Sequence, residues 1–399
     1  MAEQRNKYEI DPYLYVIITF VFLAALPGAI CGMLHVHLSP PVGILLFGIS
    51  IFAGAFILSW AAEAVQIDIS ESLAVAILAL LAVLPEYAVD FVFTWKSAHD
   101  PSQAHYAIAN MTGANRLLVG LGWPLILFLF ILVKKKKEIV LEKSHRVEVF
   151  YLAMATMYSF TIPLKGELNL IDTVILVTLF GLYTRRIAQM PTVEPEMVGP
   201  AKIIVNMTTV KRRVITIGMF LFAGAVIFFV AEPFAESLVA AGAHLGIDEF
   251  RLVQWLAPIA SESPEFIIAA TWTLRGSASS AMKALISSKV NQWTLLIGTI
   301  PLVYAISGGV IKPFMLDDLQ NHELILTAAQ SLFGVAVLAN LRFRRAEGTL
   351  LLVLFLAQLI VAEIRLEVTV AYLILAIVFH IAHRKDLIPA AMTALNIKK

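Results

Sequence analysis

Long apolar stretches separated by short polar connections occupy nearly the whole chain. The stretches, each bounded by charged residues, Pro or Gly, fall at residues 12–34, 43–66, 71–97, 103–133, 146–163, 168–187, 214–242, 249–274, 278–310, 323–341, 346–364 and 367–384. Most are close to the length of about 20 apolar residues that an α-helix needs to cross a bilayer. The pattern therefore predicts an all-α polytopic membrane protein with about 12 transmembrane helices.

The positions of the basic residues predict the orientation. If the stretches cross the membrane alternately, the connections on the side of the N-terminus contain 22 of the 30 Lys and Arg residues, and those on the other side contain five. The remaining three, Arg116, Lys283 and Lys289, fall inside the stretches. Because cytoplasmic loops collect Lys and Arg, we expect both termini in the cytoplasm and the protein in the cell (plasma) membrane.

Composition narrows the possible partners. Hydrophobic residues make up 59% of the chain and charged residues 15%, a balance typical of proteins embedded in lipid. The formal net charge of +1 does not suggest nucleic-acid binding, so we expect inorganic cations and the lipid bilayer as partners. A single cysteine, Cys31, excludes a disulfide within the chain and a cysteine metal cluster.

Two parts of the chain resemble one another. FILSWAAEAV (56–65) and LLAVLPEYAVDFVFTW (80–95) match FFVAEPFAESL (228–238) and WLAPIASESPEFIIAATW (255–272). A third stretch follows each time, AIANMTGANRLLVGLGWPL (107–125) and LISSKVNQWTLLIGTIPL (285–302), with an Asn, a Gly and then a Pro. The repeat unit has five stretches, an odd number, so the two copies must cross the membrane in opposite senses. Inverted repeats are typical of secondary transporters.

The repeats define the predicted domain organisation. It consists of an N-terminal extra helix (1–42), a first repeat (43–190), a cytoplasmic linker (191–213), a second repeat (214–366), and a C-terminal extra helix with the tail (367–399). Within the linker, AKIIVNMTTVKRRV predicts a short surface helix.

Two carboxylates fall near the middle of their stretches. Glu86 and Glu265 directly follow Pro85 and Pro264. A charge at the centre of a membrane helix costs about 2.5–3.5 kcal/mol, so its presence needs a reason. The prolines leave backbone carbonyl oxygens without their helical donors. Carboxylate and carbonyl oxygens are the ligands that Na⁺ and Ca²⁺ prefer, which predicts a cation site.

Other polar residues extend this candidate site. Asn115 and Asn291, each on the stretch after its Glu, could add amide oxygens. Residues one helical turn from these groups complete the candidate ligand set: Asp90, Ser261, Glu262 and Ser287. Glu63 and Glu236 occupy matching positions in the preceding stretches and could line an access route.

Two basic residues lie beside the candidate ligands. Arg116 follows Asn115, and Lys289 precedes Asn291 by two residues. One interpretation is that both pair with acidic side chains and neutralise the core. The other is that one of them, Lys289 especially, is an internal counter-ion that holds the carboxylates without substrate and moves aside or loses a proton when a cation enters.

These residues resemble the cation/calcium exchanger superfamily, which includes the sodium/calcium exchangers. The resemblance covers roughly residues 43–133 and 214–310 and lies in LPE at 84–86, SPE at 263–265 and the Asn-containing third stretches. It implies that Glu86 and Glu265 are the central acids, that Ser261 is a motif hydroxyl, and that Asn115 and Asn291 match a later amide or acid. The chain departs from the family pattern where hydroxyl residues are replaced, at Ala82, Val83 and Glu262.

The resemblance implies a secondary antiporter that exports Ca²⁺ or a related cation in exchange for Na⁺ or H⁺ by alternating access. One alternative is a Na⁺/H⁺ antiporter that uses protonation of Glu, Asp or Lys. Another is a passive cation channel, although channels usually obtain their symmetry from several subunits. We expect no enzyme activity, because no nucleophile–base pair or metal motif lies near mid-depth. We also expect no cofactor, since Ca²⁺, Na⁺ or H⁺ would be transported ions.

Overall fold

The computed structural model describes residues 9–68, 84–190, 197, 199–246, 248–385 and 392–393. The first part of the predicted stretch 71–97, with Ala82 and Val83, lies outside the described residues, as do Arg5, Lys7 and most of the tail. Within the residues that the structure describes, the regular structure is helical apart from four strands of two or three residues. Among the described residues, seven helical stretches are long and apolar enough to cross a membrane. These findings confirm the predicted fold class, a largely helical membrane protein with several transmembrane helices.

The chain divides into two compact units, which we describe separately. Unit 1 comprises Met1–Val92 and Ala188–Pro264, and unit 2 comprises Phe93–Ile187 and Glu265–Lys399. The division falls within two helices, α4 (Leu84–Ser97) and α12 (Glu249–Arg275). Each of these helices therefore contributes residues to both units.

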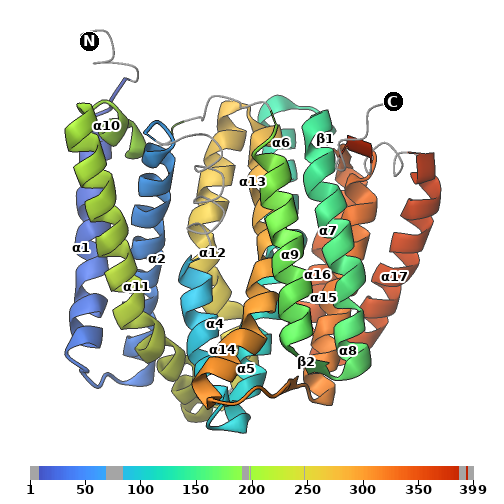
Figure 1. Cartoon of the computed structure of the whole chain (residues 1–399). Helices are drawn as coiled ribbons and strands as arrows, with labels where there is room; N and C mark the ends of the chain where they lie inside the picture. Colours follow the sequence, from blue (N-terminus) through green and yellow to red (C-terminus); the bar gives the residue numbers. More distant parts are fainter. Residues whose placement is uncertain are drawn as a thin grey trace. The chain divides into compact units, whose positions relative to one another are not determined.

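Besides its parts of α4 and α12, the described residues of unit 1 form three long helices and one short helix. They are α1 (Tyr13–Met33), α2 (Pro40–Val65), α10 (Ala201–Val205) and α11 (Thr209–Leu245). The helices α1, α2 and α11 lie side by side (Figure 1). Small residues allow the close approach: a Cβ at Gly32 would lie 3.0 Å from the carbonyl carbon of Phe229, and one at Gly43 would lie 3.0 Å from the Cβ of Ser237. Close packing over small residues is typical of membrane helices.

The predicted linker helix differs from the structure. The short helix α10 ends at Val205, and α11 begins at Thr209, inside the predicted linker 191–213. Thr208 has extended backbone angles and separates the two helices. Four residues of α10 are buried, and α10 packs against α2, so this segment is part of unit 1 and does not lie free on its surface.

An ion-pair cluster joins the end of α2 to the start of α11. Asp68 accepts hydrogen bonds from Nε and Nη2 of Arg212 at 2.6 and 2.9 Å, and from Nε of Arg213 at 3.0 Å. The side chains of Asp68 and Arg212 are largely buried. The bidentate bond from Arg212 holds the pKa of the Asp68 carboxyl below its usual value, with a further contribution from Arg213.

Unit 2 contains most of the remaining helices. In its first half these are η1 (Pro101–Gln103), α5 (Ala104–Leu117), η2 (Leu118–Gly122), α6 (Trp123–Lys134), η3 (Lys143–His145), α7 (Arg146–Ser159), α8 (Thr161–Lys165) and α9 (Leu170–Ile187). In its second half they are α13 (Ala278–Asn291), η4 (Gln292–Leu296), α14 (Ile297–Gly308), α15 (Asp318–Leu338), α16 (Arg345–Ile360), η5 (Ala362–Ile364) and α17 (Arg365–Ala382). Helix α15 packs against α7 and α17, α14 packs against α9, and α16 packs against α6.

Two short antiparallel strand pairs join connections of unit 2 that are far apart in sequence. Strand β1 (Glu138–Val140) pairs with β4 (Arg342–Arg344), and β2 (Glu167–Leu168) pairs with β3 (Phe314–Met315). The apolar residues that face one another are buried: Ile139 opposite Phe343, and Leu168 opposite Phe314. The apolar pattern predicted helices alone and did not indicate these strands.

Candidate cation site

The candidate ligands divide between the two units. Asp90, Glu86, Ser261 and Glu262 belong to unit 1, whereas Glu265, Asn115, Asn291 and Ser287 belong to unit 2. All lie on helices whose apolar sequences drive them into lipid or into the core. Six of the eight are buried, and Glu265 and Ser287 are partly exposed. Burial of so many polar groups is costly, which supports a functional reason for them.

Helix α4 contains the two acids of the first predicted repeat that were predicted as ligands, Glu86 and Asp90. The described part of the helix begins at Leu84, so Pro85 and Glu86 lie in its first described turn. Asp90 follows Glu86 by one helical turn, and both side chains are buried. The two carboxylates therefore share one buried face of α4.

Helix α12 contains the matching residues of the second predicted repeat. It runs through Pro258 and Pro264 without a break. The Ser261 hydroxyl donates to the carbonyl oxygens of Ala257, at 3.2 Å, and Pro258, at 3.4 Å. A serine that bonds back to the preceding turn can compensate for carbonyl groups that a proline leaves without a donor.

In unit 2, Lys289 of α13 reaches Asn115 of α5. Its ammonium Nζ donates to the side-chain oxygen Oδ1 of Asn115 at 2.7 Å and to the backbone oxygen of the same residue at 3.3 Å. Both side chains are buried. The ammonium also lies 4.3 Å from the centroid of the Trp293 ring, a distance that allows a cation–π interaction. A positively charged group thus already occupies one oxygen that was predicted to bind a cation.

The orientation of Asn115 fits this role. Its amide nitrogen donates to the carbonyl oxygen of Met111 at 2.9 Å, one turn earlier on α5. This bond directs the amide oxygen toward Lys289 and away from its own helix. The same oxygen can accept either an ammonium hydrogen or a metal cation, but only one cation can occupy that position at a time.

Both Asn-containing helices change to π-helical geometry near the candidate ligands. The segment η2 begins at Leu118, three residues after Asn115, and η4 begins at Gln292, directly after Asn291. A π-helical turn widens the helix and occurs frequently at functional sites. The sequence showed no clear signal for either turn. Each third stretch therefore has a π-helical turn shortly after its Asn, although the two turns begin at different distances from it.

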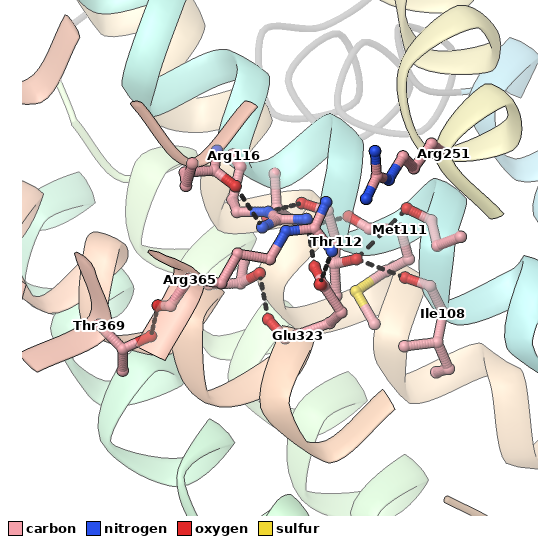
Figure 2. A network of polar contacts seen from close by, with 12 residues as sticks. Ile108, Met111, Thr112, Arg116, Arg251, Glu323, Arg365 and Thr369 are labelled. Atoms are coloured by element: carbon pink, nitrogen blue, oxygen red, sulfur yellow. Dashed lines mark hydrogen bonds and ion pairs between the residues drawn. The ribbon is translucent and has the colours of Figure 1, made fainter. Parts of the chain in front are cut away.

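Arg116 is paired within unit 2. Its Nη2 forms an ion pair with Oε2 of Glu323 on α15, and its Nη1 donates to Oε1 of Gln358 on α16 at 2.8 Å (Figure 2). Oε1 of Glu323 pairs in turn with Nη1 of Arg365, the first residue of α17. For Arg116, this geometry agrees with the interpretation that it pairs with an acid. Glu323, Gln358 and Arg365 were not among the sequence-predicted residues, although polar side chains within apolar stretches could have indicated them.

The other predicted residues occupy separate positions. The hydroxyl of Tyr183 donates to Oγ of Ser287 at 2.9 Å, which joins α9 to α13. Asn291 is buried at the end of α13. Near the end of α2, Glu63 is buried, whereas Glu236 on α11 is exposed.

Comparisons with known proteins show what the chain as a whole is similar to. A family model described as sodium/calcium exchanger protein matches residues 39–187 and 215–362. The solved structure of the H⁺/Ca²⁺ exchanger CAX is 41% identical, with a TM-score of 0.93, and the match covers 96% of this chain and 98% of that one. No protein with a curated description matches the chain.

More distant solved structures share the fold alone. Native YfkE is 16% identical with a TM-score of 0.64, and the match covers 87% of this chain and 98% of that one. The sodium–calcium exchanger NCX_Mj is 16% identical with a TM-score of 0.54, over 80% of this chain and 98% of that one.

Proposed function

Because this chain belongs to the sodium/calcium exchanger protein family, we propose that it is a secondary antiporter that moves Ca²⁺, or a related cation, across the membrane in exchange for H⁺. The choice of Ca²⁺ and H⁺ follows the 41% identity to an H⁺/Ca²⁺ exchanger over nearly the whole chain. Family membership also agrees with the expectation of a transporter without enzyme activity. Transport would proceed by alternating access of two inverted repeats, 43–190 and 214–366.

The proposed cation ligands are the polar residues that the sequence places near the middle of the predicted membrane helices. Glu86 and Glu265 supply the carboxylates, and Asn115 and Asn291 supply amide oxygens. The additional polar groups complete the shell or transfer protons: Asp90, Ser261, Glu262 and Ser287. Glu63 and Glu236 line the access route in this proposal. Oxygen donors of these kinds suit Ca²⁺, which takes six to eight oxygen ligands.

The contact between Lys289 and Asn115 is the observation that supports coupling to H⁺. The Lys289 ammonium lies 2.7 Å from the amide oxygen that Ca²⁺ would use. For Ca²⁺ to bind there, Lys289 must withdraw or release a proton, because two cations at one buried oxygen repel strongly. Release of that proton would link Ca²⁺ entry to H⁺ transfer. Lys289 would therefore act as the internal counter-ion, and Arg116 would remain paired with Glu323.

The membrane arrangement is part of the same proposal. The distribution of 22 basic residues against five supports twelve spans with both termini in the cytoplasm of the cell membrane. The N-terminal helix (1–42) and the C-terminal segment (367–399) would be additions to a ten-span core, with 191–213 as the cytoplasmic linker. The two segments that the family model matches support this division.

Reconstitution into liposomes tests the function directly. Uptake of radiolabelled Ca²⁺ should follow an imposed pH gradient and should not require Na⁺. Ca²⁺ uptake that follows only a Na⁺ gradient would show that the coupling ion is Na⁺ and not H⁺. Radiolabelled Na⁺ uptake driven by pH without Ca²⁺ movement would indicate a Na⁺/H⁺ antiporter. Cation flux without any gradient coupling would indicate a channel.

A further inference from the structure

Glu323 of α15 lies between two arginines in the interior of unit 2. One of its carboxylate oxygens pairs with Arg116 and the other pairs with Arg365 (Figure 2). The side chains of Arg116 and Glu323 are fully buried, and that of Arg365 is 15% exposed. These three side chains contribute two positive charges and one negative charge. A carboxylate that accepts from two guanidinium groups uses both of its oxygens in charge-assisted bonds.

Further bonds fix this cluster to the helix that contains Asn115. Gln358 accepts from Nη1 of Arg116 at 2.8 Å, and Nε of Arg116 donates to the Thr112 carbonyl at 3.4 Å. Gln330 of α15 donates to the backbone oxygen of Arg116 at 3.4 Å and to the hydroxyl of Tyr372 at 3.3 Å. Four helices, α5, α15, α16 and α17, therefore hold the charges of the cluster in fixed positions beside Asn115.

Arg365 lies outside the part of the chain that matches the family model. That match ends at residue 362, and Arg365 is the first residue of α17. Helix α17 thus places the charged side chain of Arg365 on Glu323, which in turn pairs with Arg116, the residue that follows Asn115.

We propose that Glu323 and Arg365 determine the cation affinity of the site by setting the charge beside Asn115. The inference rests on the proposed function, in which Asn115 is a ligand. The effective dielectric constant in a protein interior is about 20, far below that of water. Two charges that lie about 10 Å apart in the interior therefore still have a substantial interaction energy. At separations of about 10–20 Å, each charge added to or removed from the cluster should therefore change the affinity for a divalent cation by about ten- to a few hundredfold.

The signs of the expected changes separate this role from simple structural support. Glu323→Gln removes a negative charge and should weaken Ca²⁺ binding. Arg365→Gln removes a positive charge and leaves Arg116 paired with Glu323. This variant should bind Ca²⁺ more tightly. The double variant should return to near the wild-type affinity, and Arg365→Lys should keep it, since both preserve the total charge. If the three side chains only held helices together, every substitution would weaken binding or leave it unchanged.

The affinities are measured as radiolabelled Ca²⁺ and Na⁺ binding to the purified full-length chain in lipid nanodiscs. The logarithmic shift should be about twice as large for Ca²⁺ as for Na⁺, because Coulomb energy is proportional to the charge of the ion. Arg342→Gln is the matched control, since Arg342 forms an exposed pair with Glu138 on the strands β1 and β4. It should leave both affinities unchanged.

Single variants that shift Ca²⁺ affinity in the same direction, or not at all, overturn the proposal. If Glu323→Gln fails to insert, Arg365→Gln still decides: tighter binding supports the proposal, and equal or weaker binding overturns it. Wild-type protein that binds Ca²⁺ but exchanges none contradicts the antiporter function, while the affinity comparison still holds. If the wild-type protein binds neither Ca²⁺ nor Na⁺, both the antiporter function and the proposed effect of Glu323 and Arg365 on affinity are contradicted.

Discussion

The ammonium group of Lys289 donates a hydrogen bond of 2.7 Å to the side-chain oxygen of Asn115, and both residues are fully buried. The two residues lie 174 positions apart, on α13 and α5. In the proposed function, the Lys289 ammonium provides the positive charge beside the Asn115 oxygen when no metal cation is bound. Substitutions of Lys289 can therefore test its proposed role as a counter-ion.

We predict that Lys289→Met tightens Ca²⁺ binding about tenfold, because it removes a positive charge from a proposed ligand oxygen. Exchange should slow and lose most of its dependence on pH, since the internal cation can no longer alternate with Ca²⁺. The measurement is Ca²⁺ uptake into proteoliposomes across a series of pH values. Lys283→Met, on the same helix, is the control and should keep the wild-type profile. An unchanged profile in Lys289→Met would exclude the counter-ion role.

Lys289→Arg distinguishes a counter-ion that releases a proton from one whose side chain only moves aside. Arginine stays charged at every accessible pH, so it cannot release a proton. If Ca²⁺ entry requires proton release from residue 289, this variant should exchange at least tenfold more slowly than wild type while it inserts normally. Wild-type turnover in this variant would show that the side chain only moves aside.

Glu265→Gln tests the central carboxylate of the second repeat. The change preserves shape but removes a negative charge that the proposal assigns to Ca²⁺ binding. We expect loss of exchange of at least a hundredfold, with normal membrane insertion and an unchanged elution profile in size-exclusion chromatography. Glu142→Gln, an exposed acid outside the site, should exchange normally. Exchange at the wild-type rate in Glu265→Gln would remove this residue from the site.

The helical fold could be predicted because lipid demands it. A bilayer cannot satisfy backbone hydrogen bonds, so a long apolar stretch such as 12–34 or 43–66 must become a helix, as α1 and α2 do. The π-helical turns η2 and η4 and the strand pair β1–β4 could not be predicted in this way. They depend on contacts between distant segments, which leave no local periodicity.

The polar residues of the candidate site could be named from the sequence, whereas their hydrogen-bond partners could not. The hydrogen bond from Lys289 to the amide oxygen of Asn115 was not predicted from the sequence. Arg116 was expected to find either an acid or a substrate-related role, and its partner Glu323 lies 207 residues away. A polar residue in an apolar stretch indicates that a partner exists. Only the packing of α5, α13 and α15 determines which partner it is.

Asp68→Asn should destabilise unit 1 by about 1–3 kcal/mol at neutral pH, because it leaves the buried Arg212 without its carboxylate. The folded-state pKa of Asp68 is lowered from an unfolded value near 3.9. Its contribution is therefore complete above that value and is lost as the pH falls through the folded-state pKa. The thermal unfolding midpoints of wild type and Asp68→Asn in detergent should thus differ at pH 7 and converge in acid.

Arg213→Gln is the control for this ion pair. The Arg213 side chain is 59% exposed, and its loss leaves the bidentate bond between Arg212 and Asp68 in place. The expected effect is below about 1 kcal/mol. A constant difference between Asp68→Asn and wild type at all pH values would contradict an electrostatic origin of the stabilisation.

Two glycines of unit 2 provide a matched test of packing around the candidate site. A Cβ at Gly120, in the π-helical segment η2, would lie 2.5 Å from Cβ and Cδ2 of Phe355 on α16, whereas a Cβ at Gly181 on α9 would have no neighbour within 4 Å. Gly120→Ala should therefore destabilise the protein by about 1–3 kcal/mol, as overpacking usually does. Gly181→Ala should be neutral or stabilise it by up to about 1 kcal/mol through helix propensity.

The unfolding midpoint in detergent measures both effects. Adding Phe355→Ala to Gly120→Ala removes the clash, so the double variant should lose less stability than the sum of the two single changes. That non-additivity would show that the contact between η2 and α16 is the cause. Equal destabilisation by Gly120→Ala and Gly181→Ala would instead indicate that the backbone freedom of glycine matters in both helices, and that the close approach of Phe355 contributes little.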